Sequence, residues 1–378
     1  MMSRIIGLII MFFGVCLGCE AQGLTRAQAE EEMSGVVDEW YAEVRKETDY
    51  ITKRQAVVRG EKVMPLSCMV YGKLPEDGRS LFISLHGGGS APKAVNDQQW
   101  QNQWGLYRPK EGVYICPRAA YDDWNMHFKD DVDEMYKDII MYAYSHLNVN
   151  PDKVYVMGYS AGGDGVWRLA PRMADTWAAA SMMAGHPGDV SLLNLRNLPY
   201  MVWCGAEDAA YDRNKLCAER IIELDSLHRA DSEGYVHSGH IIEGKGHWMD
   251  RVDTAAVEWM AQYKRNPYPK RIVWRQEEVL KKHFYWLSVA EDEMQRGREV
   301  RVDVEGNKIT IGKCDYKNIT LHLNDKIVNL DKPVEVYVGK KRVKKAKLIR
   351  SSETMKRSIR EWGDARYCFS TEIKIEVK

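Results

Sequence analysis

The chain has 378 residues, which is enough for one large domain and a smaller second one. Its 54 Lys and Arg residues balance 54 Asp and Glu residues, so the formal net charge is zero. This balance excludes the strongly basic composition that is typical of nucleic-acid-binding proteins, and we expect no nucleic-acid partner.

The N-terminal residues have the pattern of a secretory signal. Arg4 precedes an apolar run from Ile5 to Leu17, which is too short for an ordinary membrane-spanning helix and is followed by small residues. Two processing routes fit, namely lipid attachment at Cys19 and plain cleavage before Gln22. We assign residues 1–21 to the signal peptide, and by either route the mature protein leaves the cytoplasm. We therefore expect an exported protein that is periplasmic, extracellular or an outer-membrane lipoprotein.

Residues 22–59 have apolar positions at helical spacing, which predicts an N-terminal helical segment with a structural role. Strands and helices then alternate through residue 266. We expect strands at 60–72, 81–85, 113–116, 153–157, 177–183, 199–204 and 236–243, and helices at 130–147, 162–173, 214–229 and 248–263. This alternation predicts an α/β domain over residues 60–266, with a doubly wound, mainly parallel sheet covered by helices on both faces.

Two of the predicted strands end in motifs that carry chemistry. The strand at 81–85 leads into His86-Gly87-Gly88-Gly89, where a glycine run leaves backbone N–H groups available for an oxyanion. The strand at 153–157 runs into Gly158-Tyr159-Ser160-Ala161-Gly162, and a helix follows. A strand, a G-x-S-x-G turn and a helix together are typical of a nucleophile elbow, which places the Ser160 hydroxyl at the head of the helix.

A carboxylate and a histidine follow the next strands in the same order as in serine hydrolases. Asp208 comes after the strand at 199–204, with Glu207 and Asp212 as alternative acids, and His247 comes after the strand at 236–243. Each residue alone also fits a helix cap or a turn. Ligands of such sheets bind beyond the carboxyl ends of the strands, and all of these residues fall there, which favours a catalytic interpretation.

With these motifs, residues 60–266 resemble the α/β-hydrolase superfamily, and more narrowly the secreted bacterial esterases that are polyhydroxybutyrate-depolymerase-like or feruloyl-esterase-like. The core is also similar to the catalytic domains of prolyl oligopeptidases. The resemblance implies that Ser160 is the nucleophile, His247 the general base and then acid, and Asp208 the orienting carboxylate. It places the oxyanion donors at Gly88 or Gly89 together with Ala161. No cofactor and no metal are implied.

The resemblance and the export signal suggest an esterase that acts on a polysaccharide or a related polymer. Only 47 residues separate Ser160 from Asp208, which leaves no room for a large lid over the site. Loops beyond the strands supply candidate substrate contacts through stacking and hydrogen bonds, although loop packing explains them equally well. These are Trp124, Asn125, His127, His186 and Trp248. The alternatives are a secreted serine peptidase of prolyl-oligopeptidase-like type and a non-catalytic carbohydrate-binding protein on a hydrolase core.

Residues 267–378 have a different pattern, with short runs of period-two alternation that predict a small antiparallel β-sandwich. Residues 268–378 contain 26 Lys and Arg against 17 Asp and Glu, which makes this accessory domain basic. A surface for acidic polysaccharide and a solvated face docked on an acidic neighbour both fit, and we favour the second. Cys314 and Cys368 both lie in this domain and are the first disulfide pair to test.

Overall fold

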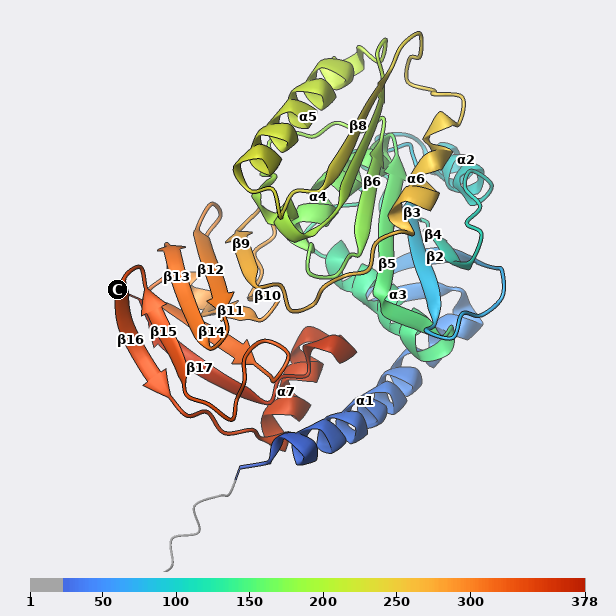
Figure 1. Ribbon diagram of the computed structural model, residues 1–378. Coiled ribbons are helices and arrows are strands. Elements are labelled where there is room, and N and C mark those ends of the chain that lie inside the picture. The colour runs from blue at the N-terminus through green and yellow to red at the C-terminus, as the bar shows by residue number, and fades with distance from the viewer. Residues whose placement is uncertain (1–22, 378) are drawn as a thin grey trace, which may run out of the picture.

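The computed structural model describes residues 23–377, and the expected signal peptide therefore lies outside the described residues. Its centre is an eight-stranded sheet with the order β1-β2-β4-β3-β5-β6-β7-β8 (Figure 1). The strands are β1 (Ala56–Arg59), β2 (Lys62–Tyr71), β3 (Arg79–Leu85), β4 (Gly112–Pro117), β5 (Val149–Tyr159), β6 (Ala179–Met183), β7 (Tyr200–Gly205) and β8 (His237–Ile242). From β4 to β8 every pairing is parallel, and β2 runs antiparallel to β1 and to β4. The predicted mainly parallel sheet is confirmed.

Six helices accompany this sheet: α1 (Arg26–Arg54), α2 (Lys93–Trp104), α3 (Val132–His146), α4 (Ala161–Arg172), α5 (Arg213–Ala230) and α6 (Ala255–Met260). Alternate residues of the central strands enter two different cores, because successive side chains of a strand point to opposite faces. Val154 and Val156 of β5 belong to a core cluster that includes buried residues of α1, α3, α4 and α5, whereas Tyr155 and Met157 belong to a second cluster with residues of α2 and α6. The sheet is therefore covered on both faces, as predicted.

Several predicted elements of the large domain differ from the structure in their bounds or in their presence. The sheet begins at Ala56 and not at residue 60, because β1 pairs antiparallel with β2. Helix α2 was not expected, since its sequence is largely polar on all sides. The helix expected at 248–263 is only a short 3₁₀ turn at 252–254 followed by α6.

The C-terminal module consists of two small sheets, ordered β16-β15-β13-β12-β9 and β10-β11-β14-β17. Its strands are β9 (Arg271–Arg275), β10 (His283–Phe284), β11 (Leu287–Val289), β12 (Glu299–Glu305), β13 (Lys308–Cys314), β14 (Asn318–Leu323), β15 (Val334–Val338), β16 (Lys341–Ala346) and β17 (Thr371–Glu376). The predicted β-rich module is confirmed, although β13 and β15 pair in parallel and a helix, α7 (Ser352–Trp362), follows β16.

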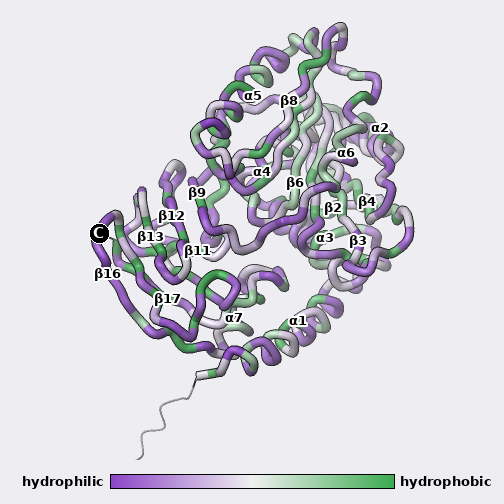
Figure 2. Tube along the Cα trace, in the orientation of Figure 1, coloured by the Kyte–Doolittle hydropathy of each residue, from purple (hydrophilic) through white to green (hydrophobic). Residues whose placement is uncertain are grey.

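The basic run of the C-terminal module has a structural explanation. Strand β16 contains Lys341, Arg342, Lys344 and Lys345, and it is an edge strand whose residues are exposed almost throughout. Figure 2 shows this strand as a hydrophilic segment. Charged side chains on an edge strand prevent pairing with a second sheet, so charge here protects the edge.

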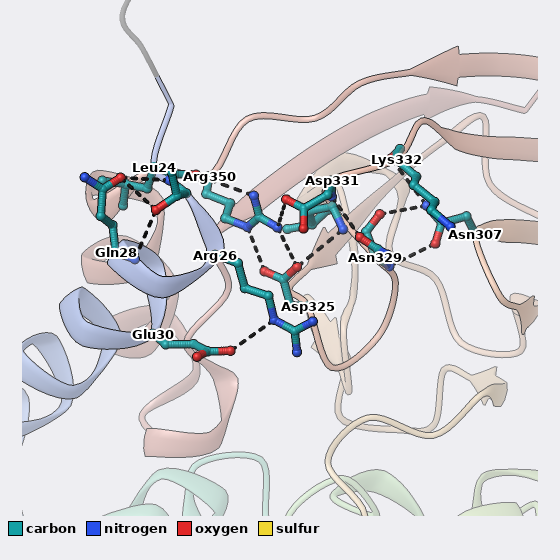
Figure 3. Close-up of polar contacts among 12 residues, drawn as sticks. Leu24, Arg26, Gln28, Glu30, Asn307, Asp325, Asn329, Asp331, Lys332 and Arg350 are labelled. Atoms are coloured by element: carbon teal, nitrogen blue, oxygen red, sulfur yellow. Dashed lines mark hydrogen bonds and ion pairs between the residues drawn. The ribbon is translucent and has the colours of Figure 1, made fainter.

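Helix α1 connects the two parts of the molecule. It packs against α3 of the large domain and against α7 of the C-terminal module. Just before the helix, Leu24 exchanges hydrogen bonds with Arg350, at 3.3 Å from Leu24 N to Arg350 O and 3.5 Å from Arg350 Nη1 to Leu24 O. Arg350 Nη2 in turn lies 2.7 Å from Asp325 Oδ1 and 2.8 Å from Asp331 Oδ1. Figure 3 shows these contacts. The segment therefore ties the chain's N-terminal helix to its last module.

The candidate disulfide between Cys314 and Cys368 is not formed. Cys368 is a buried thiol whose Sγ lies 3.8 Å from the carbonyl oxygen of Met355. Packing in the module's own core keeps it away from the surface, and burial raises its pKa to about 12.

Among residues 23–377, no helix combines the length and the hydropathy that a membrane span requires.

Candidate active site

Ser160 lies in a sharp turn between β5 and α4. Its backbone has φ 57° and ψ −122°, a conformation that costs a residue other than glycine about 1–3 kcal/mol. Only glycines fit on both sides of it. A Cβ added at Gly158 would lie 2.3 Å from the carbonyl oxygen of Gly162, and one added at Gly162 would lie 2.1 Å from that of Leu85. The sequence motif is therefore a consequence of backbone crowding at the turn.

Ser160, His247 and Asp208 form a continuous hydrogen-bonded chain. The Ser160 Oγ lies 2.9 Å from His247 Nε2, and His247 Nδ1 lies 2.8 Å from Asp208 Oδ2. In the tautomer that satisfies both contacts, Nδ1–H donates to the carboxylate and Nε2 accepts from the serine hydroxyl. The three residues follow β5, β7 and β8, so the carboxyl ends of these strands bring them together.

The structure distinguishes Asp208 from the two alternative acids. The Asp208 side chain is 1 % exposed, whereas Glu207 and Asp212 are exposed residues of the same loop. The Asp208 Oδ1 lies 3.5 Å from Arg213 Nη1, and this cation offsets part of the cost of burying the carboxylate. Arg213 was not identified in the sequence.

Tyr159 holds the loop that carries His247. Its hydroxyl donates to the carbonyl oxygen of His247 at 2.6 Å and accepts from the amide of Met249 at 3.1 Å. Burial raises the pKa of the Tyr159 hydroxyl above its usual value, so the group stays protonated and remains a donor. Tyr159 is the variable second residue of G-x-S-x-G, and no pattern in the sequence marks it.

The glycine loop after β3 lies beside Ser160, with positive φ at Gly88 (110°) and Gly89 (84°). The amide of Gly89 is not available for an oxyanion, because it donates to Asn96 Oδ1 at 2.9 Å. Of the predicted donors, the amides of Gly88 and Ala161 remain, and both residues line a cavity beside Ser160. Asn96 was not identified in the sequence.

Two cavities open on either side of Ser160. The first has a volume of about 350 Å³ and contains Trp124, Phe128, Arg168, His186, Tyr211 and Arg213 in its walls. Asp164 also lines it, and burial raises the pKa of that carboxyl. The second has a volume of about 700 Å³ and contains Gln99, Asn102, Leu106, Tyr159, His247, Trp248 and Arg251. We name them the Trp124 cavity and the Trp248 cavity.

In the part of the chain that the structure describes, no three or more His, Cys, Asp or Glu side chains are grouped so as to hold a metal ion.

Three of the five predicted substrate contacts line these cavities, and two do not. Trp124, His186 and Trp248 are wall residues, and the two tryptophans are 60 % and 50 % exposed. His127 is fully buried, where its Nε2 lies 2.8 Å from the carbonyl oxygen of His86 and its Nδ1 lies 3.2 Å from the Tyr136 hydroxyl. Asn125 is half-buried and lines neither cavity. The prediction for His127 was wrong and Asn125 is not among the wall residues, since the loop turns inward after the exposed Asp123 and Trp124.

Comparison with known proteins finds no matching protein-family model and no matching curated protein. Solved structures with partial similarity include a thermostable esterase, with a TM-score of 0.42 and 17 % identity over 56 % of this chain and 62 % of that one. A fluorophosphonate-binding serine hydrolase from Staphylococcus aureus has a TM-score of 0.38 and 13 % identity, over 55 % of this chain and 96 % of that one. A feruloyl esterase module from Clostridium thermocellum has a TM-score of 0.39 and 13 % identity, over 55 % of this chain and 86 % of that one.

The large domain has the predicted α/β-hydrolase fold, and the evidence for this lies in the chain itself. The strand order, the elbow after β5 and the glycine loop after β3 all have the places that the fold requires.

Proposed function

We propose that this chain is a serine hydrolase that cleaves carboxylic esters through an acyl-enzyme on Ser160. The observation that carries the proposal is the hydrogen-bonded chain from Asp208 through His247 to Ser160, with the serine held in an elbow between two cavities. A nucleophile, a base in contact with it and a third group that orients the base are the parts that acyl transfer needs.

In the first half-reaction, His247 Nε2 takes the proton of the Ser160 hydroxyl as Oγ attacks the ester carbonyl carbon. The carbonyl π bond becomes a lone pair on oxygen, and the amides of Gly88 and Ala161 stabilise this oxyanion. Asp208 keeps His247 in the required tautomer and stabilises the imidazolium that forms. The elbow places the developing charge at the N-terminus of α4, where the helix dipole favours it.

The position of His247 assigns the two cavities. The imidazolium returns its proton to the leaving alcohol oxygen, so the alcohol must lie on the side of His247, in the Trp248 cavity. The acyl group then occupies the Trp124 cavity, which Ala161 and Tyr211 help to line. After the alcohol has left, a water molecule attacks the acyl-enzyme on the same side, and His247 acts as base and then acid again.

The substrate is proposed to be an ester on a polysaccharide or a related polymer outside the cytoplasm. The signal sequence of residues 1–21 supports export, and the two open cavities with exposed Trp124 and Trp248 support a bulky substrate. Exposed tryptophan faces suit stacking on sugar rings or aromatic groups.

A panel of p-nitrophenyl esters and peptide p-nitroanilides tests the proposal on the purified mature protein. We expect ester hydrolysis that disappears in Ser160→Ala, with anilide turnover at least about 100-fold lower, because an amide nitrogen must be protonated to leave and a phenolate need not be. Comparable turnover of anilides would make the protein a peptidase. Ester turnover that survives in Ser160→Ala would remove Ser160 from the mechanism.

A further inference from the structure

A buried polar side chain lies directly behind the oxyanion loop. Asn96 in α2 is completely buried, although its chain neighbours on the helix are half-buried or exposed. Its Oδ1 accepts from the amide of Gly89 at 2.9 Å, and its Nδ2 donates to the carbonyl oxygen of Ala91 at 3.0 Å and to Asp122 Oδ1 at 2.8 Å. All the polar atoms of this amide are therefore used within the protein.

The three partners of Asn96 define which amide atom points where. Gly89 offers an N–H and needs an acceptor, whereas Ala91 and Asp122 offer oxygens and need donors. An asparagine side chain supplies one acceptor and two donors at this spacing, and neither aspartate nor leucine does. The site is thus specific for the chemistry of an amide.

The Asp122 end of this network is also held by hydrogen bonds within the protein. Asp122 forms a hydrogen-bonded ion pair with Arg118, whose side chain is 6 % exposed. Arg118 also contacts Asp97 Oδ1 at 2.9 Å and donates to the carbonyl oxygen of Ala119 at 2.7 Å. Asn96 consequently connects the glycine loop to a network of ion pairs around the buried Arg118.

Asn96 also limits how Gly88 can sit. A Cβ added at Gly88 would lie 2.3 Å from Asn96 Oδ1, so the amide packs directly against the Gly88 backbone. The hydrogen bond from the Gly89 N–H to Asn96 holds the Gly88–Gly89 peptide group in place, which restricts rotation about the Gly88 backbone. The direction of the Gly88 N–H is then fixed before a substrate arrives, which is the preorganisation that an oxyanion hole needs.

We propose that Asn96 is a positioning residue that sets the oxyanion hole by capturing the Gly89 amide and thereby aiming the Gly88 amide at the reacting oxygen. This inference rests on the proposed function. Asn96 is not itself a wall residue of either cavity, so it acts through the glycine loop. Because the oxyanion exists only near the transition state, disturbing Asn96 lowers kcat and leaves KM nearly unchanged.

The test is the steady-state hydrolysis of p-nitrophenyl acetate by Asn96→Asp. The carboxylate keeps an acceptor for Gly89 but turns an oxygen without a proton toward Asp122. We expect kcat to fall by about 10- to 100-fold with KM within about twofold, less than the roughly 100- to 1,000-fold loss of a whole oxyanion donor. The matched control Gln101→Glu makes a comparable change at an exposed position of α2 and should leave both constants unchanged.

Rescue separates positioning from a general structural role. In the double variant Asn96→Asp with Asp122→Asn, the donor and the acceptor exchange places. The new amide at position 122 can donate through its nitrogen to the new carboxylate at position 96 while its oxygen still accepts from Arg118, and two carboxylates are no longer in contact. We expect the double variant to recover about tenfold of the lost kcat, a coupling that is typical of residues in one hydrogen-bond network. If Asn96→Asp does not fold, Asn96→Ala carries the kcat and KM test, since it removes the contacts without adding charge.

A folded Asn96→Asp or Asn96→Ala with kcat within about twofold of the unmodified protein would overturn the inference while leaving the proposed function intact. A loss confined to KM, or no recovery in the double variant, would overturn it as well. Absence of Ser160-dependent ester hydrolysis in the unmodified protein would instead overturn the proposed function and this inference together.

Discussion

A serine, a histidine and a carboxylate in contact are not unique to the Ser160 site. In the C-terminal module, Ser288 Oγ lies 2.8 Å from His322 Nε2, and His322 Nδ1 lies 3.5 Å from Glu372 Oε2. The His322 side chain is only 6 % exposed and packs against Trp362, whereas the His247 side chain is 43 % exposed. Contact distances alone therefore do not define a catalytic site, and access and the strained elbow distinguish Ser160.

Single substitutions test which carboxylate orients His247. We expect Asp208→Asn to lower kcat by about 10⁴-fold, because the amide favours the wrong tautomer of His247. Glu207→Gln and Asp212→Asn make the same chemical change at exposed positions of the same loop and should keep kcat within about twofold. The measurement is ester hydrolysis by the three purified variants, and a large loss in either control would assign the acid to that residue.

The elements that carry short motifs were predictable from the sequence, and those that depend on distant partners were not. The elbow and the glycine loop are local patterns with their own steric reasons, so Ser160 and Gly88 could be named in advance. Asn96 lies in a polar helix without clear periodicity, and its burial comes from partners 7 and 26 residues away. Such residues are recognised only once the fold brings their partners together.

The glycine loop also depends on a neutral histidine. His86 Nδ1–H donates to the carbonyl oxygen of Gly87 at 2.7 Å, and its Nε2 accepts from the amide of Ala119 at 3.1 Å. A proton added to Nε2 would point at this N–H group. Burial lowers the pKa of His86 to about 4, so the folded protein keeps the ring neutral.

This gives a prediction for stability against pH. In the unfolded chain His86 has its ordinary pKa of about 6.5. Between pH 6.5 and pH 4 the unfolded chain therefore binds a proton at His86 that the folded protein does not bind. Stability contributed by His86 is complete above about pH 6.5 and falls by about 3 kcal/mol as the pH drops to 4. Urea unfolding at pH 7 and pH 5 measures it. In His86→Gln we expect a lower stability at pH 7 and a smaller decline toward pH 5, and an undiminished decline would refute the assignment.

The whole molecule is held together by contacts that cross between its two parts. Basic groups of the C-terminal module pair with acidic groups of the large domain, including Lys281 with Asp133 at 2.5 Å and Arg296 with Asp189 at 2.7 Å. This docking on an acidic neighbour supports our preferred interpretation of the module's positive charge. The change of pattern near residue 267 was visible in the sequence, but these long-range pairs were not.

The buried pair between Arg265 and Asp364 should dominate this connection. Arg265 Nη1 lies 2.7 Å from Asp364 Oδ2, and the two side chains are 1 % and 9 % exposed. We expect Asp364→Ala to lower the free energy of unfolding by about 3 kcal/mol, because it leaves the buried Arg265 guanidinium with only the more distant carboxylate of Asp152, 3.4 Å from Nη2. Arg360→Ala breaks an exposed pair between α7 and Glu43 of α1 and should lower the free energy of unfolding far less, because solvent screens the pair. Chemical denaturation of both variants measures the difference, and equal losses would contradict it.

The most direct test of the central proposal is to react the mature protein with a fluorophosphonate and map the adduct by peptide mass spectrometry. We expect one stoichiometric adduct on Ser160, none in Ser160→Ala, and labelling slowed by about 10³-fold or more in His247→Ala. Failure of the folded protein to label, or an adduct on another residue, would contradict the assignment of Ser160 as the nucleophile.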